Sequence, residues 1–304
     1  MKFNSAPMKT EKMIKKHLLG QLTVNEVQEY LKTNQTVILP YGVVEQHGFH
    51  LPLDTDIRNA TYMGEQIAKA LGVVMAPTVN YCFSGGMLAG TINIKPNTFS
   101  NLMGEIIESL HLQGFRNFII LSGHGGSESF LHLKESLRIL KWMNPSLHDA
   151  MILLPPLWEF SPTWLSFFQH EDYHAADAET SLLLHWCPEV VRSKVVIDEE
   201  PIFERMKADP DAFQLRTTLS SLQQEIPNTS QRDEVKVGVM GDPSGASKET
   251  GQKINDEILE NMVPAICEAI LQATQSRISH QQIEIADNSR LKILGSLQEK
   301  NTTK

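Results

Sequence analysis

The chain has 304 residues, of which 41% are hydrophobic and 21% charged, and its formal net charge at pH 7 is −9. This length and composition are typical of a soluble globular protein with a sizeable core. The net negative charge argues against nucleic acid or an anionic membrane as a partner, because both attract clusters of positive charge.

Strand-like and helical segments alternate along the chain. The sequence predicts a buried strand at 36–44 and a helix at 56–72, with Asp56 as its N-cap and Gly72 at its end. The segments that follow are a strand at 73–79, a helix at 97–114, a strand at 115–121, a helix at 128–143 and a strand at 150–158. This alternation predicts an α/β fold with a mostly parallel sheet covered by helices on both faces.

Three domain-level segments are expected. Residues 1–35 form an N-terminal lead, residues 36–275 a single domain, and residues 276–304 a C-terminal appendage. Within the domain, the segment from about 198 to 236 is polar and strand-poor, which indicates an excursion or lid rather than core.

Cysteine usage and the N-terminus predict the cellular compartment. Cys82, Cys187 and Cys267 are scattered and form no CxxC pair, which suits a reducing cytoplasm better than a disulfide framework. The first 20 residues are polar and basic and lack the apolar core of a signal peptide, and no stretch has the length and apolarity of a membrane span. We therefore expect a cytoplasmic protein.

Polar side chains gather in three clusters that lie just past predicted strand ends or on neighbouring elements, and α/β proteins place their functional groups beyond the carboxyl ends of the strands. The clusters are Glu45, His47, His50, Asp54 and Asp56; then His124 in "GHGGS"; then His170, His174, Asp177 and Glu179. Each cluster alone has an ordinary explanation. The first suits a solvated loop, the second a phosphate cradle that lacks the lysine of a P-loop, and the third the first turn of an amphipathic helix.

Together the clusters indicate a metal site. Mixed imidazole and carboxylate ligands suit Zn²⁺, Mn²⁺ and Fe²⁺. A carboxylate shared between two such ions holds them about 3.5 Å apart and lets them activate one water. The absence of thiolates favours a hydrolytic centre over a structural zinc site.

The segment "LPYGVVEQHGFHLPLDTD" (39–56) resembles the metal-binding segment of the creatininase family. Further similarities follow in the family's order: "GTINI" (90–94), "LSGHGG" (121–126), "HAADAETS" (174–181) and "GVMGDPSGAS" (238–247). The resemblance implies a three-layer α/β/α sandwich, a homo-oligomer, a small-molecule substrate and two divalent metal ions, Zn²⁺ or Mn²⁺ with Fe²⁺ as a further candidate.

The resemblance also implies roles for individual residues. Glu45 and His124 would bind one metal, His47 the other, and Asp56 both, while His174 would transfer a proton next to the substrate. The last ligand of the second metal is assigned to Glu179, with Glu128 as the rival.

Three positions depart from the family pattern. Gly126 stands where creatininase has a glutamate, Ser127 replaces an asparagine, and Asp177 ends "HAAD" where "HAGE" is usual. Creatinine itself is therefore not the expected substrate.

The expected activity is metal-dependent hydrolysis, in which a metal-bridging hydroxide attacks a carbonyl of a small cyclic amide or formamide and a C–N bond breaks. One alternative is hydrolytic C–C ring opening of a cyclic polyhydroxy diketone of the 3-dehydro-inosose type. The others are a metal-stabilised binding protein without turnover and a nucleotide-binding protein that uses "GHGGS". Trp158 and Trp164 are candidates for a substrate wall, with plain packing as the alternative.

Overall fold

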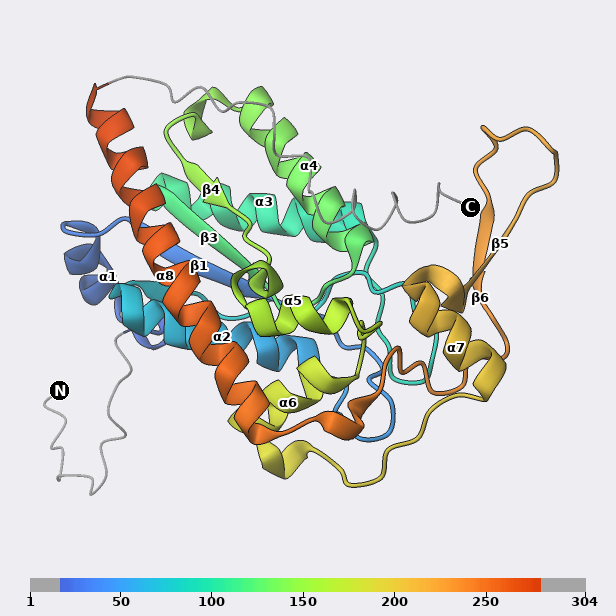
Figure 1. Ribbon diagram of the computed structural model, residues 1–304. Helices are drawn as coiled ribbons and strands as arrows, with labels where there is room; N and C mark the ends of the chain where they lie inside the picture. Colours follow the sequence, from blue (N-terminus) through green and yellow to red (C-terminus); the bar gives the residue numbers. More distant parts are fainter. Residues whose placement is uncertain (1–16, 280–304) are drawn as a thin grey trace, which may run out of the picture. The chain divides into compact units, whose positions relative to one another are not determined.

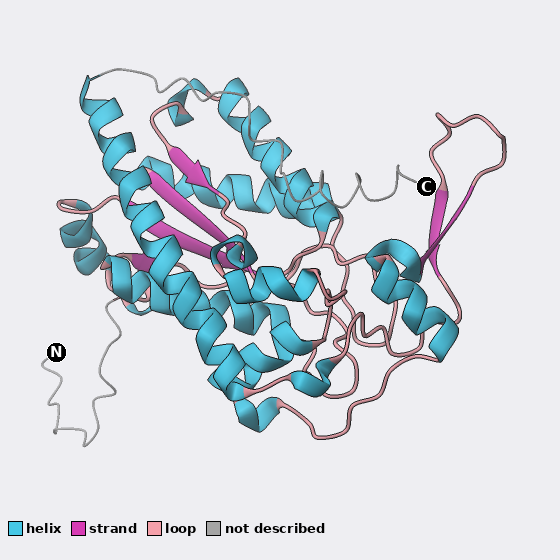
Figure 2. Cartoon of the chain, viewed as in Figure 1, coloured by secondary structure: helices cyan, strands magenta, loops and turns pink. Residues whose placement is uncertain are grey.

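A computed structural model describes residues 17–279 (Figures 1 and 2). The basic N-terminal residues 1–16 and most of the expected C-terminal appendage lie outside this range. The chain divides into two units, residues 1–267 and residues 268–304, and every residue considered below for the site belongs to the first. No helix in the described range combines the length and apolarity needed to cross a membrane.

The centre of the first unit is a four-stranded parallel sheet. Its strands are β1 (Thr36–Tyr41), β2 (Val74–Met75), β3 (Asn117–Ser122) and β4 (Met151–Leu153), in the order β2-β1-β3-β4. β1 and β3 pair over their full length, from Thr36 opposite Asn117 to Tyr41 opposite Ser122, and every residue of both is buried. The two carboxyl ends therefore lie side by side.

Helices cover both faces of this sheet, because successive strand residues point to opposite sides. On one face, Val37, Leu39 and Phe118 join a core with residues of α3 (Pro96–Gln113) and α4 (Ser127–Met143). On the other face, α2 (Thr55–Leu71) comes so close at Gly64 that an added Cβ would lie 2.9 Å from Met75 Sδ. Figure 1 shows the resulting layers, which confirm the predicted fold class.

Two predicted helix ends are confirmed and one predicted cap is wrong. Gly72 and Gly114 end α2 and α3 with φ values of 66° and 116°, a left-handed conformation that favours glycine. Asp56 is not the N-cap of α2, because the helix begins at Thr55 and position 54 precedes it. The Asp56 carboxylate is turned into the polar cluster described below.

The predicted strands at 73–79 and 150–158 are shorter in the structure. The structure contains only Val74–Met75 and Met151–Leu153 of them. Proline explains both endings, since Pro77, Pro155 and Pro156 have no backbone N–H to donate to a neighbouring strand.

The remaining α-helices of the described residues are α1 (Val24–Leu31), α5 (Pro162–Phe168), α6 (Asp177–Trp186), α7 (Glu200–Ala208) and α8 (Lys248–Ser279). α1 lies within the expected N-terminal lead.

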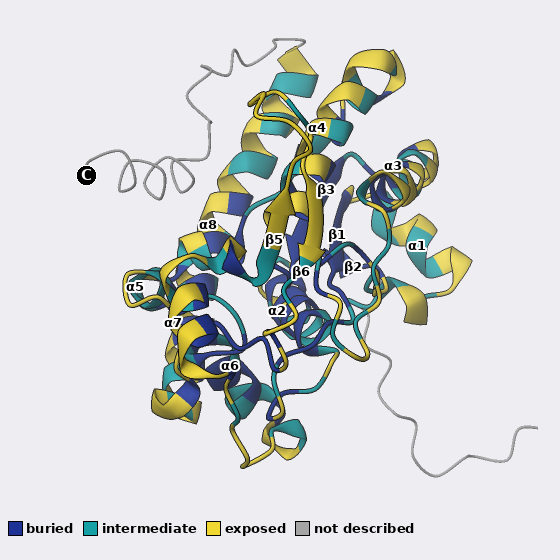
Figure 3. Cartoon of the chain, turned by 90° about the vertical axis from the view of Figure 1, so that its right-hand side faces the viewer, coloured by how far each residue is buried: buried dark blue, intermediate teal, exposed yellow. Residues whose placement is uncertain are grey.

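The excursion at 198–236 is not devoid of strands. It contains α7 and a hairpin of β5 (Gln214–Thr217) and β6 (Asn228–Gln231), paired from Gln214 opposite Gln231. Figure 3 shows this hairpin as largely exposed. Because polar residues lie on both faces of the hairpin, its sequence lacks the alternating hydrophobic residues that predict a strand.

Candidate metal centre

Two glycines allow α2 to start close to the carboxyl ends of β1 and β3. An added Cβ on Gly123, just after β3, would lie 1.9 Å from the carbonyl oxygen of Asp56. On Gly42, just after β1, it would lie 2.5 Å from the backbone nitrogen of Ile57. Because neither position has room for a side chain, the first turn of α2 packs directly on both loops. Asp56 is thereby brought between the residues that follow the two strands.

Asp56 contacts a histidine with each of its carboxylate oxygens. Its Oδ1 lies 3.1 Å from His47 Nε2, and its Oδ2 lies 3.1 Å from His124 Nδ1. Glu45 Oε2 lies 3.3 Å from His124 Nδ1, and Glu179 Oε2 lies 3.6 Å from His47 Nε2. Two groups of three potential ligands result, Glu45–Asp56–His124 and His47–Asp56–Glu179, and they share Asp56.

The donor atoms fit a pair of cations. Glu45 Oε2, His47 Nε2 and Asp56 Oδ1 are buried and, beyond the contacts within the cluster just given, have no hydrogen-bond partner among the described residues. Buried polar atoms of this kind are costly unless they are paired, and imidazole and carboxylate together are the ligands that borderline divalent ions prefer. The residues present are therefore suited to hold divalent metal ions.

The pKa values in this cluster follow from its charges. Burial alone would lower the pKa of His47, but the carboxylates of Asp56 and Glu179 outweigh it and raise that pKa well above its usual value. Burial would also raise the pKa of Asp56, yet His47 and His124 hold it far below its ordinary value. The pKa of Glu179 is also lowered, chiefly by His47 against the effect of burial, so the carboxylates of Asp56 and Glu179 stay ionised and favour positive charge between them.

Backbone contacts orient two of the side chains. His47 Nδ1 lies 3.2 Å from the carbonyl oxygen of Glu45 and donates to it, which leaves Nε2 directed at the carboxylates. The backbone N–H of Ala175 donates to Glu179 Oε2 at 2.7 Å. Ala175 has a φ of 53°, a left-handed conformation that is uncommon for a residue with a side chain. This turn aims its N–H at the carboxylate.

The two rival glutamates lie in different surroundings. Glu179 is in the first turn of α6 and belongs to the cluster. Glu128 is exposed at the start of α4, where its carboxylate accepts from the Ser127 hydroxyl. Gly126 also has a geometric explanation, because an added Cβ there would lie 2.1 Å from His124 Nε2. The position of this histidine ring leaves no room for the glutamate that creatininase has.

The other residues of the three sequence clusters lie outside both shared groups. His50 is buried with Nε2 3.1 Å from the Thr180 hydroxyl, Asp54 pairs with Arg58 at 2.8 Å, and His170 is exposed. Asp177 starts α6 and is in neither group.

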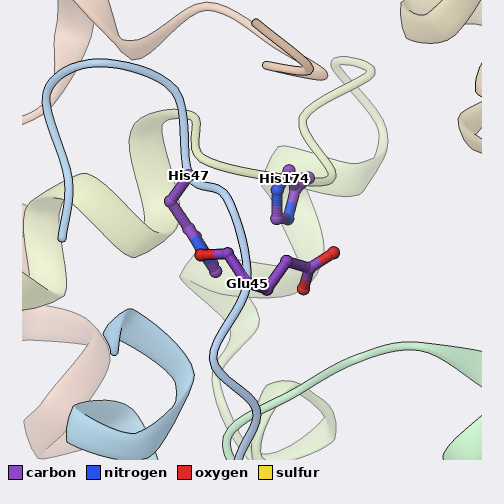
Figure 4. Close-up of side chains that lie close together, drawn as sticks. All are labelled: Glu45, His47 and His174. Carbon is purple, nitrogen blue, oxygen red and sulfur yellow. The ribbon is translucent and has the colours of Figure 1, made fainter. Parts of the chain in front are cut away.

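His174 lies beside the cluster. Its ring centroid is 4.4 Å from that of His47, and Glu45, His47 and His174 form a third group of potential ligands (Figure 4). Trp158 lies beside the residue that follows His124, since an added Cβ on Gly125 would lie 3.8 Å from the Trp158 ring. Trp164 is buried and packs edge-on against Trp158.

Three polar residues with structural roles around the site were not singled out from the sequence. Gln46 contacts His174, Asp172 accepts from the Ala178 N–H at 3.3 Å, and Asp198 accepts three backbone N–H groups. Burial and the nearby Glu179 carboxylate raise the pKa of Asp172 to about 7. The only sequence signal for Gln46 and Asp172 is that each is within two residues of a predicted site residue.

Comparison with known proteins identifies the family. The family model for creatininase, described as creatinine amidohydrolase, matches residues 20–266. The chain belongs to the creatininase family.

Two relatives and one solved structure show which proteins this creatininase-family chain is similar to. It is 30% identical over 262 residues to a mycofactocin precursor peptide peptidase from Mycobacterium ulcerans (strain Agy99), covering 82% of this chain and 91% of the relative. It is 28% identical over 191 residues, 59% of each chain, to a 3-dehydro-scyllo-inosose hydrolase from Thermotoga maritima. A crystal structure of creatinine amidohydrolase (creatininase) matches with a TM-score of 0.67 at 22% identity, covering 84% of this chain and 98% of the other. The family and these relatives are hydrolases, and so is this chain.

Proposed function

We propose that the chain is a hydrolase with two divalent metal ions that cleaves a C–N bond in a small cyclic amide or formamide. Glu45, Asp56 and His124 would hold one ion, and His47, Asp56 and Glu179 the other. The observation that carries this proposal is the division of the Asp56 carboxylate, with one oxygen 3.1 Å from each histidine. Zn²⁺ and Mn²⁺ are the proposed metals, with Fe²⁺ as a third candidate.

The side chains of the chain itself would supply positioning and proton transfer. Ions bound to these residues would activate water and polarise the substrate carbonyl. His174 is placed beside Glu45 and His47, where it would give a proton to the leaving nitrogen. Trp158, partly exposed beside Gly125, would contact an apolar part of the substrate.

Two further substrates follow from the relatives. The 30% identical relative is a peptide peptidase, which favours an amide bond within a peptide as the second candidate. The inosose hydrolase favours C–C ring opening of a cyclic polyhydroxy diketone. All three reactions begin with attack of water on a carbonyl group, so one metal centre serves each of them.

The experiment is metal analysis followed by a substrate screen. Metal-free protein is loaded with Zn²⁺ or Mn²⁺ and assayed on cyclic amides, formamides, short peptides and inosose-type ketones. We expect about two ions per chain and hydrolysis of at least one class. The Asp56→Asn variant should lose bound metal and turnover together, whereas Asp54→Asn is the matched control, since Asp54 lies two residues away and pairs with Arg58.

Turnover that survives complete chelation would refute the proposal, as would full activity of the Asp56→Asn variant. Two bound ions without hydrolysis of any class would favour the metal-stabilised binding protein. Phosphate-ligand binding that survives chelation would favour the nucleotide-binding alternative. Light scattering on the same preparation tests the proposed homo-oligomer, and cell fractionation tests the cytoplasmic location.

A further inference from the structure

The "GTINI" segment supplies none of the proposed metal ligands, yet it holds the loop that carries two of them. The backbone N–H of Gln46 donates to Thr91 Oγ1 at 3.1 Å, and the N–H of Ile92 donates to the carbonyl oxygen of Val44 at 2.8 Å. These two hydrogen bonds lie on either side of Glu45. The backbone of this proposed ligand is therefore held by residues far along the chain.

Asn93, in the same segment, folds a turn that contains two glycines. Its Oδ1 accepts from the backbone N–H groups of Ser84 and Gly85 at 3.0 and 3.1 Å, and its Nδ2 donates to the carbonyl oxygen of Gly86 at 2.7 Å. A rotation of this carboxamide by 180° would set N–H against N–H and oxygen against oxygen. One side chain thus holds three consecutive residues in one conformation.

This turn packs beside the carboxylate of Glu45. Gly86 is buried, and a Cβ added to it would lie 3.9 Å from Glu45 Oε1, an ordinary van der Waals contact. Oε2 of the same carboxylate lies 3.3 Å from His124 Nδ1. The carboxylate is therefore placed between the turn and the polar cluster, and the turn limits its rotation away from His124.

The segment binds both loops because its side chains and backbone groups alternate. The side chains of Thr91 and Asn93 face the two loops, as expected for residues two apart on an extended stretch of chain. The backbone N–H of Ile94 donates to the Cys82 carbonyl oxygen at 2.9 Å, just before the turn. The side chain of Ile92, which lies between the two polar residues, is 43% exposed. Four consecutive residues therefore fix the two loops relative to each other.

We propose that Thr91 and Asn93 are positioning residues for Glu45. Thr91 holds the backbone of Glu45 through the N–H of the following residue, and Asn93 confines its side chain through the turn. That Glu45 binds a metal ion rests on the proposed function. The hydrogen bonds of Thr91 and Asn93 do not, because hydrogen–deuterium exchange measures them in metal-free protein.

The first experiment follows this exchange by mass spectrometry. Thr91→Val keeps the shape of the side chain and removes its hydroxyl, so the Gln46 N–H should exchange about 3-fold to 10-fold faster, as expected for the loss of one hydrogen bond. Thr91→Ser keeps the hydroxyl and should restore the wild-type rate. Thr78→Val is the matched control, because the partly buried Thr78 hydroxyl lies 2.7 Å from that of Thr61.

Asn93→Ala tests the turn in the same way. The peptide that covers Ser84 and Gly85 should exchange faster, since both backbone N–H groups lose their acceptor. Asn144→Ala is the control, because Asn144 Oδ1 also accepts a backbone N–H, that of Ser146 at 3.2 Å, at the end of α4. This control should leave exchange in the turn unchanged.

The second experiment measures zinc affinity by competition with a chromophoric chelator. The two proposed ions should bind in separate steps, and Glu45→Gln identifies the step to which Glu45 contributes. We expect this step to weaken about 3-fold to 10-fold in Thr91→Val and Asn93→Ala, while the other step stays unchanged. Thr91→Ser should bind zinc like the wild type. Because a general loss of stability would weaken both steps alike, a selective effect separates positioning from a purely structural role.

Three results would overturn the proposal. The first is wild-type exchange at Gln46 in Thr91→Val. The second is faster exchange with both zinc steps at wild-type strength, because the hydrogen bonds would then stabilise the loops without positioning Glu45. The third is equal weakening of both steps, which would show a general loss of the fold. A wild-type protein that binds no zinc would refute the proposed metal centre, and the exchange rates would then decide whether Thr91 and Asn93 hold the loops.

Discussion

Replacement of Gly126 by alanine tests the geometry of His124 directly. The added Cβ would lie 2.1 Å from His124 Nε2, whereas ordinary contacts begin at 3.4 Å. The ring or its loop must therefore move by about 1.3 Å, although His124 Nδ1 lies only 3.1 Å from Asp56 and 3.3 Å from Glu45.

The magnitude follows from the cost of overpacking, which is about 1 to 3 kcal/mol for a well-packed site. If this cost falls on the metal-bound state, zinc affinity drops about 5-fold to 150-fold, because ligand distances tolerate only about 0.2 Å. Competition with a chromophoric chelator measures the affinity, and thermal unfolding of the metal-free protein reports any general loss of stability.

The control is the neighbouring glycine. An alanine Cβ at Gly125 would lie 3.8 Å from the Trp158 ring, an ordinary contact, so Gly125→Ala should bind zinc like the wild type. Wild-type zinc affinity in Gly126→Ala would refute the placement of His124, and equal weakening in both variants would show that the whole loop, rather than the histidine, is sensitive.

The remaining predictions concern three carboxylates. Glu179→Gln should empty the second metal position while Glu128→Gln leaves it filled, as measured by zinc content; the reverse pattern would transfer the assignment to Glu128. Asp198→Ala should lower the free energy of unfolding by about 1 to 3 kcal/mol, because three backbone N–H groups, those of Val237 and Gly238 buried, lose their acceptor. Urea unfolding measures this loss, and an equal loss in the exposed control Asp233→Ala would contradict the prediction. The pKa of Asp172, raised to about 7, means that the folded state binds its proton more tightly than the unfolded chain. The loss of folding stability caused by ionising this buried carboxyl is therefore absent below about pH 4 and grows as the pH rises to 7. In metal-free protein, the stability of Asp172→Asn relative to the wild type should therefore increase over that range. Urea unfolding at pH 4.5, 5.5 and 6.5 measures this difference. A difference that does not change with pH would show that the carboxyl of the wild type is already ionised.

The sequence predicted those parts of the fold that have a strong local pattern. β1 and β3 are short apolar runs, α2, α3 and α4 carry a helical pattern, and Gly72 and Gly114 end their helices as predicted. The hairpin of β5 and β6 was missed because its polar residues carry no such period.

For the site, the sequence predicted which side chains form the polar cluster better than it predicted which residues hold them in place. Glu45, His47, Asp56, His124 and Glu179 lie together as the family resemblance implied, although their binding of metal remains a prediction. Sequence proximity kept Glu128 as a rival, since only the folded chain reveals that its side chain faces solvent. The contacts of Gln46 depend on residues 128 and 192 positions away, which no local pattern encodes.

The Asp198 carboxylate joins the two ends of the excursion, since it lies at the start of this segment and binds N–H groups at its end. Between those ends, residues of α7 and Ala212 pack with Leu88 and Tyr173 from other parts of the chain, whereas the loop that joins β5 and β6 is largely exposed. Residues can be inserted, removed or exchanged there at a small entropic cost, while the stem keeps its geometry. This exposed loop is therefore a natural place for an evolving lineage, or a protein engineer, to change the length of the chain without rebuilding the polar cluster.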